Sequence, residues 1–179
     1  MAFRTVTSKY AHDKIDFTVD NLVVVRGAYC IICELEKDAW IKVGSLGKAR
    51  FPRGVYVYVG SAQRGIEQRV GRHRSRKKKL KWHIDHFLEK AEVAAVIAVP
   101  SEDKETECGL AKTILKISGA SVPMMGFGSS DCKCDSHLVY MGDEDLEPVT
   151  ETIVYRMSML STVYPEKRAD SQSLPGSRQ

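Results

Sequence analysis

Residues 55–62 read VYVYVGSA, a strict alternation of valine and tyrosine that runs into a glycine. Successive side chains of a strand point to opposite faces, so the three valines share one face and Tyr56 and Tyr58 lie together on the other. Two tyrosines on one side of a short strand can form a functional site or a packing pair. The stretch therefore predicts a strand, and its tyrosine face is a candidate site.

Two further strands precede this one. The segment NLVVVRGAYCIICE, residues 21–34, is rich in the β-branched and aromatic residues typical of strands, and it predicts a strand over residues 28–35. A polar turn then leads to a second strand around residues 40–43. The glycine- and proline-containing segment at residues 44–54 is typical of a loop. We expect a hairpin followed by a long loop.

A basic helix is expected directly after the tyrosine strand. Ile66 and Val70 are four residues apart, as two neighbours on the apolar side of a helix are. Arg69 and His73 have the same spacing, so they share one helical face. The helix would therefore carry a cation and an imidazole side by side.

The remaining elements complete an α+β pattern. A second helix is expected at residues 81–91, a buried strand at residues 93–99, and a helix at residues 103–118 that Ser101 or Asp103 could cap. The resulting order is β-β-β-α-α-β-α. It indicates an α+β domain with a small, mostly antiparallel sheet flanked by helices.

The domain boundaries follow from changes in composition. Residues 1–20 show no clear period and are expected to form an N-terminal extension, and residues 21–141 form the domain itself. After an acidic linker, residues 142–164 are expected to pack on the domain as a C-terminal extension. Residues 165–179 are polar and are expected to be a disordered tail.

Composition narrows the class of protein. The 179 residues are 43% hydrophobic and 28% charged, which suits one globular domain with short extensions. No stretch approaches the roughly 18–20 apolar residues that span a bilayer. The N-terminus lacks the apolar centre of a secretory signal. Five cysteines do not describe a disulfide-stapled secreted scaffold. We expect a cytoplasmic protein without a membrane partner, whose thiols are reduced or bind metal.

The positive charge is concentrated in one segment. The formal net charge is only +4, yet the segment from Arg64 to Lys81 holds nine Lys or Arg residues and one acid, Glu67. Such a run could track a phosphate backbone, or it could be a solvated charged turn. Trp82 is the one nearby aromatic residue, so phosphate positioning fits better than base stacking. The candidate nucleic-acid-binding residues are Arg64, Arg72, Arg74, Arg76, Lys77, Lys78, Lys79, Lys81 and His83.

Two tripeptides and three single residues form a pattern together. The tripeptides are Gly27-Ala28-Tyr29 and Tyr58-Val59-Gly60, and the single residues that follow are Arg69, His73 and Glu107. In order, spacing and element type, the chain resembles the GIY-YIG nuclease family over roughly residues 25–140. Within that family it is most similar to a poorly characterised subgroup marked by YVYVGSA, WHID, EC and GFGSSDCKCDSHL.

The resemblance implies a catalytic set of Tyr29, Tyr58, Arg69, His73 and Glu107. Glu107 would be the single carboxylate ligand of Mg²⁺ or Mn²⁺. Tyr58 would accept the proton of the attacking water, although a tyrosine of ordinary pKa, about 10, is a poor base near neutrality. Arg69 and the metal would favour its ionised form, and Arg69 would hold the phosphate. Tyr29 and His73 would orient water, phosphate or leaving group.

Each of these residue types also has an ordinary structural role. A strand tyrosine often packs in a core, a helical arginine is usually solvated, and a lone glutamate often caps a helix or pairs with a cation. The sequence also departs from the family pattern, because Ser61 stands where some relatives carry a lysine after the second tripeptide. The late asparagine of many relatives has no clear counterpart.

A second cluster could bind zinc. Cys132, Cys134 and His137 lie within six residues, and Cys108 or His83 could complete four ligands, since thiolates and imidazoles are the ligands that zinc prefers. The alternative is that they fill a tight glycine-rich turn, with the thiols acting as small buried apolar groups. Cys30 and Cys33 would point to opposite faces of a strand, which makes them weaker candidates.

The expected helix at residues 81–91 carries His83, Asp85 and His86. The two histidines share a helical face, which permits metal binding. We favour an alternative in which His83 and Asp85 tie this helix to the site or the substrate, and His86 is structural or exposed.

From these patterns we expect a divalent-metal-dependent endonuclease that hydrolyses phosphodiester bonds in DNA, in repair or recombination. The alternative is a non-catalytic nucleic-acid-binding module on the same fold with a structural zinc. Loss of cleavage in Tyr58→Phe, Arg69→Ala and Glu107→Ala proteins would favour the first, and salt-dependent binding without turnover would favour the second.

Overall fold

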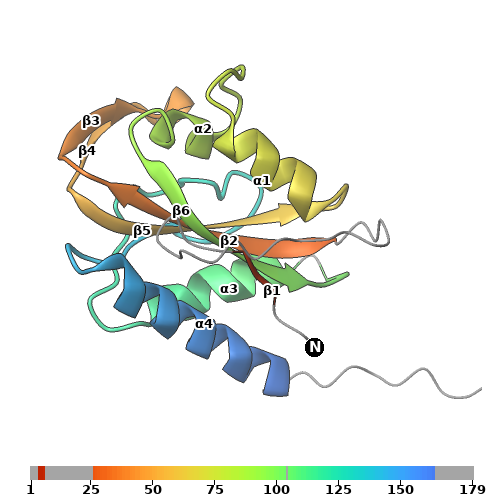
Figure 1. Cartoon of the computed structure of the whole chain (residues 1–179). Helices are drawn as coiled ribbons and strands as arrows, with labels where there is room; N and C mark the ends of the chain where they lie inside the picture. The colour runs from red at the N-terminus through yellow and green to blue at the C-terminus, as the bar shows by residue number, and fades with distance from the viewer. Residues whose placement is uncertain (1–3, 7–25, 104, 164–179) are drawn as a thin grey trace, which may run out of the picture.

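The computed structural model describes residues 4–6, 26–103 and 105–163. It confirms an α+β fold in which helices flank a small antiparallel sheet (Figure 1). In chain order the elements are β1 (Arg4–Val6), β2 (Gly27–Leu35), β3 (Ala39–Lys42), the 3₁₀ turn η1 (Gly44–Leu46), β4 (Lys48–Phe51), β5 (Gly54–Ala62), α1 (Ile66–Arg74), α2 (His83–Phe87), β6 (Glu92–Pro100), α3 (Thr106–Leu115), β7 (Leu138–Tyr140) and α4 (Leu146–Val163).

The main sheet has five strands in the order β1-β6-β2-β5-β7, and each neighbouring pair is antiparallel. The central strand β2 pairs with β5 from Gly27 opposite Ala62 to Leu35 opposite Gly54. In this register Tyr29 faces Gly60, so the two tripeptides of the sequence pattern lie side by side.

Side-chain alternation divides the sheet into two apolar faces, as the valine–tyrosine pattern predicts. Tyr56 and Tyr58 lie in one buried cluster, and the three valines of β5 lie in the other. Figure 1 shows α1 and α2 over the first face and α3 and α4 over the second. Because both faces are covered, the central strands β2 and β5 are buried along nearly their whole length rather than on alternate residues.

The predicted hairpin between the first two strands is wrong. β3 pairs with β4 in a separate two-stranded sheet, whereas β2 pairs with β5 and β6. The segment expected to be a loop therefore contains a strand. Lys48 and Arg50 occupy two of the four positions of β4, and this charge together with the flanking glycines hid the strand.

Two helices differ from their predicted bounds. α2 is limited to His83–Phe87 and is followed by a turn, although a helix was expected over residues 81–91. α3 begins at Thr106 with Glu105 as the N-cap, so neither Ser101 nor Asp103 caps it. Those two residues instead build the preceding turn, where the Ser101 hydroxyl lies 2.7 Å from the Thr106 hydroxyl and Asp103 accepts a hydrogen bond from the Glu105 amide.

The two extensions contribute elements to the domain. β1, inside the expected N-terminal extension, adds an edge strand to the main sheet next to β6. α4, inside the expected C-terminal extension, contributes Val149, Ile153 and Met157 to the core beneath α3. The expected tail at residues 165–179 lies outside the described residues. Among the described residues, no helix combines the length and apolar character needed to cross a membrane.

Candidate functional site

Tyr29 and His73 meet beneath α1. Tyr29 is 2% exposed, and its hydroxyl lies 2.9 Å from Nε2 of His73, which is 3% exposed. Gly60, opposite Tyr29 in the sheet, leaves the space for this ring, because a Cβ at Gly60 would collide with the tyrosine hydroxyl. The small residue of the second tripeptide therefore positions the tyrosine of the first.

Tyr58 lies on the same face of the sheet and is 8% exposed. Its ring stands edge-on to the His73 ring at 6.2 Å between centroids, with Phe127 on another side at 6.2 Å. Burial raises the pKa of both Tyr29 and Tyr58, and the charge of Arg69 lowers it. Glu107 raises the pKa of both, so its carboxylate lies within electrostatic reach of the two hydroxyls.

Not every tyrosine on this face belongs to the site. Tyr56 precedes Tyr58 by two residues, but its hydroxyl donates a 2.5 Å hydrogen bond to the Pro52 carbonyl at the other end of the strand. Its ring packs against Phe87 and Tyr140. The two tyrosines therefore differ in role. Tyr56 is a packing residue, whereas Tyr58 lies near the His73 imidazole and the Arg69 guanidinium.

Trp82 orders the arginines of α1. The guanidinium of Arg69 stacks on the Trp82 ring at 4.2 Å from its centroid, and that of Arg72 does so at 4.4 Å. The Lys81 ammonium lies 5.4 Å from the same centroid. Stacking on an aromatic ring restricts the arginine side chain and leaves the guanidinium edge available to an anion.

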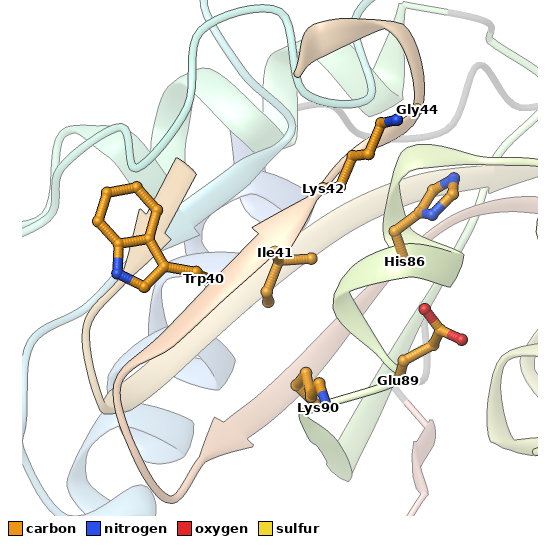
Figure 2. Close-up of a pocket in the computed structure, with 7 residues that line it drawn as sticks. All are labelled: Trp40, Ile41, Lys42, Gly44, His86, Glu89 and Lys90. Atoms are coloured by element: carbon orange, nitrogen blue, oxygen red, sulfur yellow. The ribbon is translucent and has the colours of Figure 1, made fainter. Parts of the chain in front are cut away.

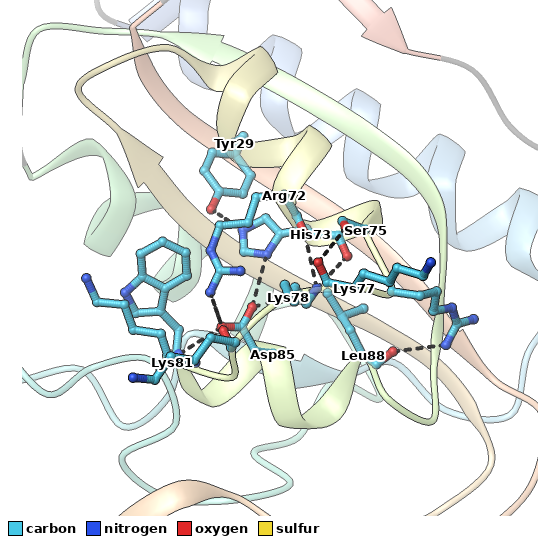
Figure 3. A network of polar contacts seen from close by, with 12 residues as sticks. Tyr29, Arg72, His73, Ser75, Lys77, Lys78, Lys81, Asp85 and Leu88 are labelled. Carbon is cyan, nitrogen blue, oxygen red and sulfur yellow. Dashed lines mark hydrogen bonds and ion pairs between the residues drawn. The ribbon is translucent and has the colours of Figure 1, made fainter.

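A buried carboxylate, Asp85, organises the basic segment from below (Figure 3). Its Oδ2 atom accepts hydrogen bonds from the Arg72 guanidinium at 2.6 Å and from the amides of Lys81 and Trp82 at 2.9 and 3.0 Å. Lys78 lies 3.7 Å from Oδ1 and also donates to the carbonyl groups of Arg72 and His73. Asp85 thus holds together α1, α2 and the basic turn, which is the segment of residues 75–82 between the two helices.

The imidazole of His73 lies between Tyr29 and Asp85. Its Nδ1 atom is 4.0 Å from Asp85 Oδ1, and within the part of the chain that the structure describes neither atom has a hydrogen-bond partner. Burial, followed by the charge of Lys78, lowers the pKa of His73 to about 4 despite the nearby carboxylate. His73 is therefore neutral at physiological pH, and its burial makes it a weaker proton acceptor than an exposed histidine.

The nine candidate nucleic-acid-binding residues separate into two groups. Arg72 and Lys78 are engaged by Asp85 and by main-chain carbonyls, and His83 accepts a 3.0 Å hydrogen bond from the Gly128 amide. Arg76 is exposed but contacts Glu92 and the Leu88 carbonyl. The exposed remainder comprises Arg64, Arg74, Lys77, Lys79 and Lys81.

A pocket of about 410 Å³ lies on the same side of the sheet, between β3 and α2 (Figure 2). It is lined by Trp40, Ile41, Lys42, Gly44, His86, Glu89 and Lys90. None of the five candidate catalytic residues borders it. A metal shared by His83 and His86 was the less favoured interpretation, and His83 Nδ1 instead accepts a hydrogen bond from the Gly128 amide. His86 is half-buried at the pocket wall.

The structure brings Cys108, Cys132, Cys134 and His137 together into a Cys₃His cluster that could bind a metal such as zinc, with all four ligand atoms within 4.8 Å of one another. Nε2 of His137 lies 3.4 Å from Sγ of Cys132 and 3.9 Å from Sγ of Cys108. Tetrahedral zinc with ordinary Zn–S and Zn–N bonds requires such a separation to be about 3.6 Å.

The cluster joins two parts of the fold. Cys108 lies on α3, whereas the other three residues belong to the loop that leads into β7. This loop is folded by its own main chain, since the amides of Gly126 and His137 donate 2.7 Å hydrogen bonds to the carbonyls of Asp135 and Phe127. The thiols are therefore presented by a preformed turn. Cys30 and Cys33 lie in opposite cores, as their strand spacing predicts.

Glu107 connects the cluster to the tyrosines. Its Oε1 atom lies 3.0 Å from Nδ1 of His137, and its side chain is 20% exposed. Burial lowers the pKa of His137, but the hydrogen bond and charge of Glu107 outweigh this and raise it. This contact spans thirty positions of sequence, and no local pattern indicates it.

Two residues of the site have a larger role in the structure than their sequence context indicates. The sequence predicts that Asp85 ties its helix to the site or the substrate, and in the structure it is the buried centre of the basic segment. Trp82 was noted only as an isolated aromatic residue. The signal for both was their position, since an acid and an aromatic residue that directly follow a run of cations are well placed to order it.

Comparison with known proteins identifies a family. Residues 28–159 match the family described as "Domain of unknown function DUF123", and because this match covers most of the chain, the chain belongs to that family. No curated protein and no solved structure gives a significant match.

Proposed function

We propose that this DUF123 protein is a divalent-metal-dependent endonuclease with a GIY-YIG-type site that hydrolyses phosphodiester bonds in DNA. The observation that carries the proposal is the contact between the Tyr29 hydroxyl and Nε2 of His73. Around it, Tyr58, Arg69 and Glu107 lie within electrostatic reach. Hydrolysis of a phosphodiester needs a proton acceptor for water, a cation for the phosphoryl oxygens and a metal ligand, and this set contains all three.

Tyr29 is the residue best placed to take the proton of the attacking water. With the proton of the neutral imidazole on Nδ1, which faces Asp85, Nε2 accepts from the Tyr29 hydroxyl, and the tyrosine can then accept a proton from water while passing its own to the imidazole. A buried tyrosine cannot act as a base by itself, because burial raises its pKa and keeps the hydroxyl protonated. His73 would receive the tyrosine's proton. Asp85 behind the imidazole favours the imidazolium that forms, whereas burial and the charge of Lys78 oppose it and lower the pKa of His73 to about 4. The proposal gives Tyr29 the role that the family resemblance implies for Tyr58.

Arg69 and Tyr58 would act on the phosphate. The guanidinium, held against Trp82, can donate two parallel hydrogen bonds to phosphoryl oxygens, and it remains charged at all relevant pH values. Tyr58 stays protonated, since burial raises its pKa, and it can therefore donate to an oxygen that gains negative charge.

Glu107 would hold Mg²⁺ or Mn²⁺. Only one of its oxygens is used by His137, which leaves the other for a cation, and a single carboxylate suits Mg²⁺ because this ion keeps most of its waters. Bound there, the ion would polarise the phosphoryl group.

The Cys₃His cluster is proposed to hold a structural zinc ion. Three thiols and one imidazole form a complete tetrahedral set with no position left for substrate, which is typical of structural rather than catalytic zinc. Elemental analysis of protein purified without chelators tests this, with zinc expected at one ion per chain. A content far below one would refute it.

The nuclease proposal is tested with purified full-length protein, Mg²⁺ or Mn²⁺, and nicked, flapped, branched and abasic DNA. Cleavage is expected for the natural sequence and for Tyr56→Phe, a matched control on the same strand face that does not reach His73. Tyr29→Phe, Arg69→Ala and Glu107→Ala should each reduce the rate at least ~100-fold, the scale of losing a general base or a charge stabiliser.

Two other outcomes would change the conclusion. Equal cleavage by all three site variants would point to a contaminant and refute the proposal. Salt-dependent binding of DNA without turnover on any substrate would favour the alternative, a non-catalytic nucleic-acid-binding module on this fold.

A further inference from the structure

The two ring nitrogens of His137 contact different groups. Nε2 faces the thiols of Cys132 and Cys108, and Nδ1 faces Oε1 of Glu107 at 3.0 Å. A neutral imidazole carries one N–H donor and one lone pair. The carboxylate can only accept, so the proton belongs on Nδ1, and the lone pair of Nε2 is directed at the thiols. This is the tautomer that a metal ion among those thiols requires.

Helix α3 supplies both a ligand and this acceptor. Glu107 and Cys108 are adjacent in its first turn, and each reaches a different ring nitrogen of His137. The imidazole is 2% exposed, and a buried ring whose two nitrogens each have a partner is fixed in orientation.

We infer that Glu107 is the positioning carboxylate of a zinc centre formed by Cys108, Cys132, Cys134 and His137, and that this zinc centre in turn holds Glu107 at the tyrosine site. The first half depends on the zinc proposal. The second half also rests on the proposed nuclease function.

The consequence is a reciprocal coupling between the two sites. Zinc binding orders His137, and His137 then engages one oxygen of Glu107, whose charge is felt by both Tyr29 and Tyr58. If zinc orders Glu107 through His137, removal of the Glu107 carboxylate should in turn weaken zinc binding. The zinc affinity can be measured without any nuclease assay, so it tests the inference directly.

The experiment measures zinc dissociation constants of the full-length protein by competition with a chromophoric chelator at fixed pH. Loss of an acceptor behind a metal-bound histidine commonly weakens metal binding ~10–100-fold, so Glu107→Ala is expected to fall in that range. Glu107→Gln keeps an oxygen acceptor without the charge, so its zinc affinity should lie between those of the natural sequence and Glu107→Ala. Glu105→Ala removes an exposed carboxylate from the same end of α3, and it should leave zinc affinity unchanged.

Each result has a definite meaning. Equal zinc affinity in Glu107→Ala and the natural sequence overturns the inference while leaving a structural zinc in place. Absence of zinc binding in the natural sequence overturns both the zinc proposal and the inference. A Co²⁺-loaded Glu107→Ala protein that keeps the thiolate charge-transfer bands shows that the variant is folded and that its weaker affinity is not due to a lost ligand. Absence of DNA cleavage bears only on the nuclease proposal and on the second half of the inference.

Discussion

At the scale of single residues, the geometry depends on how closely Tyr29 and Gly60 pack. The tyrosine reaches His73 only because the residue opposite it in the sheet has no side chain. Gly60 has an ordinary φ, so its requirement for glycine comes from space rather than from backbone conformation. A glycine in a strand interior commonly marks such a close approach.

Gly60→Ala should therefore displace the Tyr29 ring and break the contact with His73. We expect loss of cleavage comparable to that of Tyr29→Phe, together with destabilisation of about 1–3 kcal/mol from overpacking. Urea denaturation and the cleavage assay measure the two effects. Gly71→Ala on α1 is the control, because no atom lies within 4 Å of its added Cβ, and it should stabilise the protein by about 0.5–1 kcal/mol. Equal behaviour of the two variants would contradict this account.

His73 makes stability depend on pH. Its pKa is about 4 in the folded protein and is expected to be near 6.5 when unfolded, so the unfolded chain binds more protons between these values. The free energy of unfolding should then rise with pH in this window and fall as the pH is lowered from about 6.5 to 4, by up to about 3 kcal/mol. The charged or titratable groups around it are Tyr29, Tyr58, Arg69, Arg72, Lys78 and Asp85.

Denaturation of the natural sequence and of His73→Gln at several pH values between 4 and 7 measures this contribution. The glutamine variant should lose most of the slope, since the remaining groups near residue 73 are shared by both proteins. An unchanged slope in His73→Gln would assign the pH dependence to other groups.

At the scale of elements, Asp85 determines how α1, α2 and the basic turn fit together. Asp85→Asn removes the charge that Arg72 and Lys78 face, and it leaves these cations partly buried without their partner. Removing one member of a buried ion pair typically costs roughly 3–5 kcal/mol, and partial exposure of Arg72 favours the lower end. The exposed pair of Asp38 with Arg50 is the control, and Asp38→Asn should destabilise the protein far less than Asp85→Asn because water screens the exposed charges. Chemical denaturation of both variants decides whether Asp85 has this role.

Elements with a clear period were predictable, and those set by long-range contacts were not. β5 and α1 follow from the alternation at residues 55–59 and from the four-residue spacing of Ile66 and Val70. The charged residues of β4 do not by themselves indicate a strand. They are extended because β4 pairs with β3, and this pairing is not visible in the local sequence. Similarly, the pattern placed Tyr29, Arg69 and Glu107 on suitable elements, but the contacts from Glu107 to His137 and from Arg72 to Asp85 join distant segments and required the structure.

At the scale of the whole molecule, the basic segment lies on one face of the sheet. It comprises α1 and the turn before α2 on that face, whereas α3 covers the other face (Figure 1). Both faces carry exposed lysines, however, so composition alone does not determine where DNA binds. The net charge of +4 would attract DNA only weakly if it were evenly spread.

Paired substitutions on the two faces separate local contacts from overall charge. Lys77→Gln with Lys79→Gln removes two exposed cations beside the candidate site, and Lys112→Gln with Lys116→Gln removes two exposed cations from α3 and its C-terminal end. Each double variant lowers the net charge equally. We expect DNA to lie along the face that carries the basic segment. The slope of log affinity against log salt should then become less steep by about 0.9 for each lost phosphate contact in the first variant and stay unchanged in the second. Fluorescence anisotropy across a salt series measures both slopes. Equal decreases in the two variants would mean that overall charge, rather than the segment beside Tyr29 and Arg69, attracts the nucleic acid.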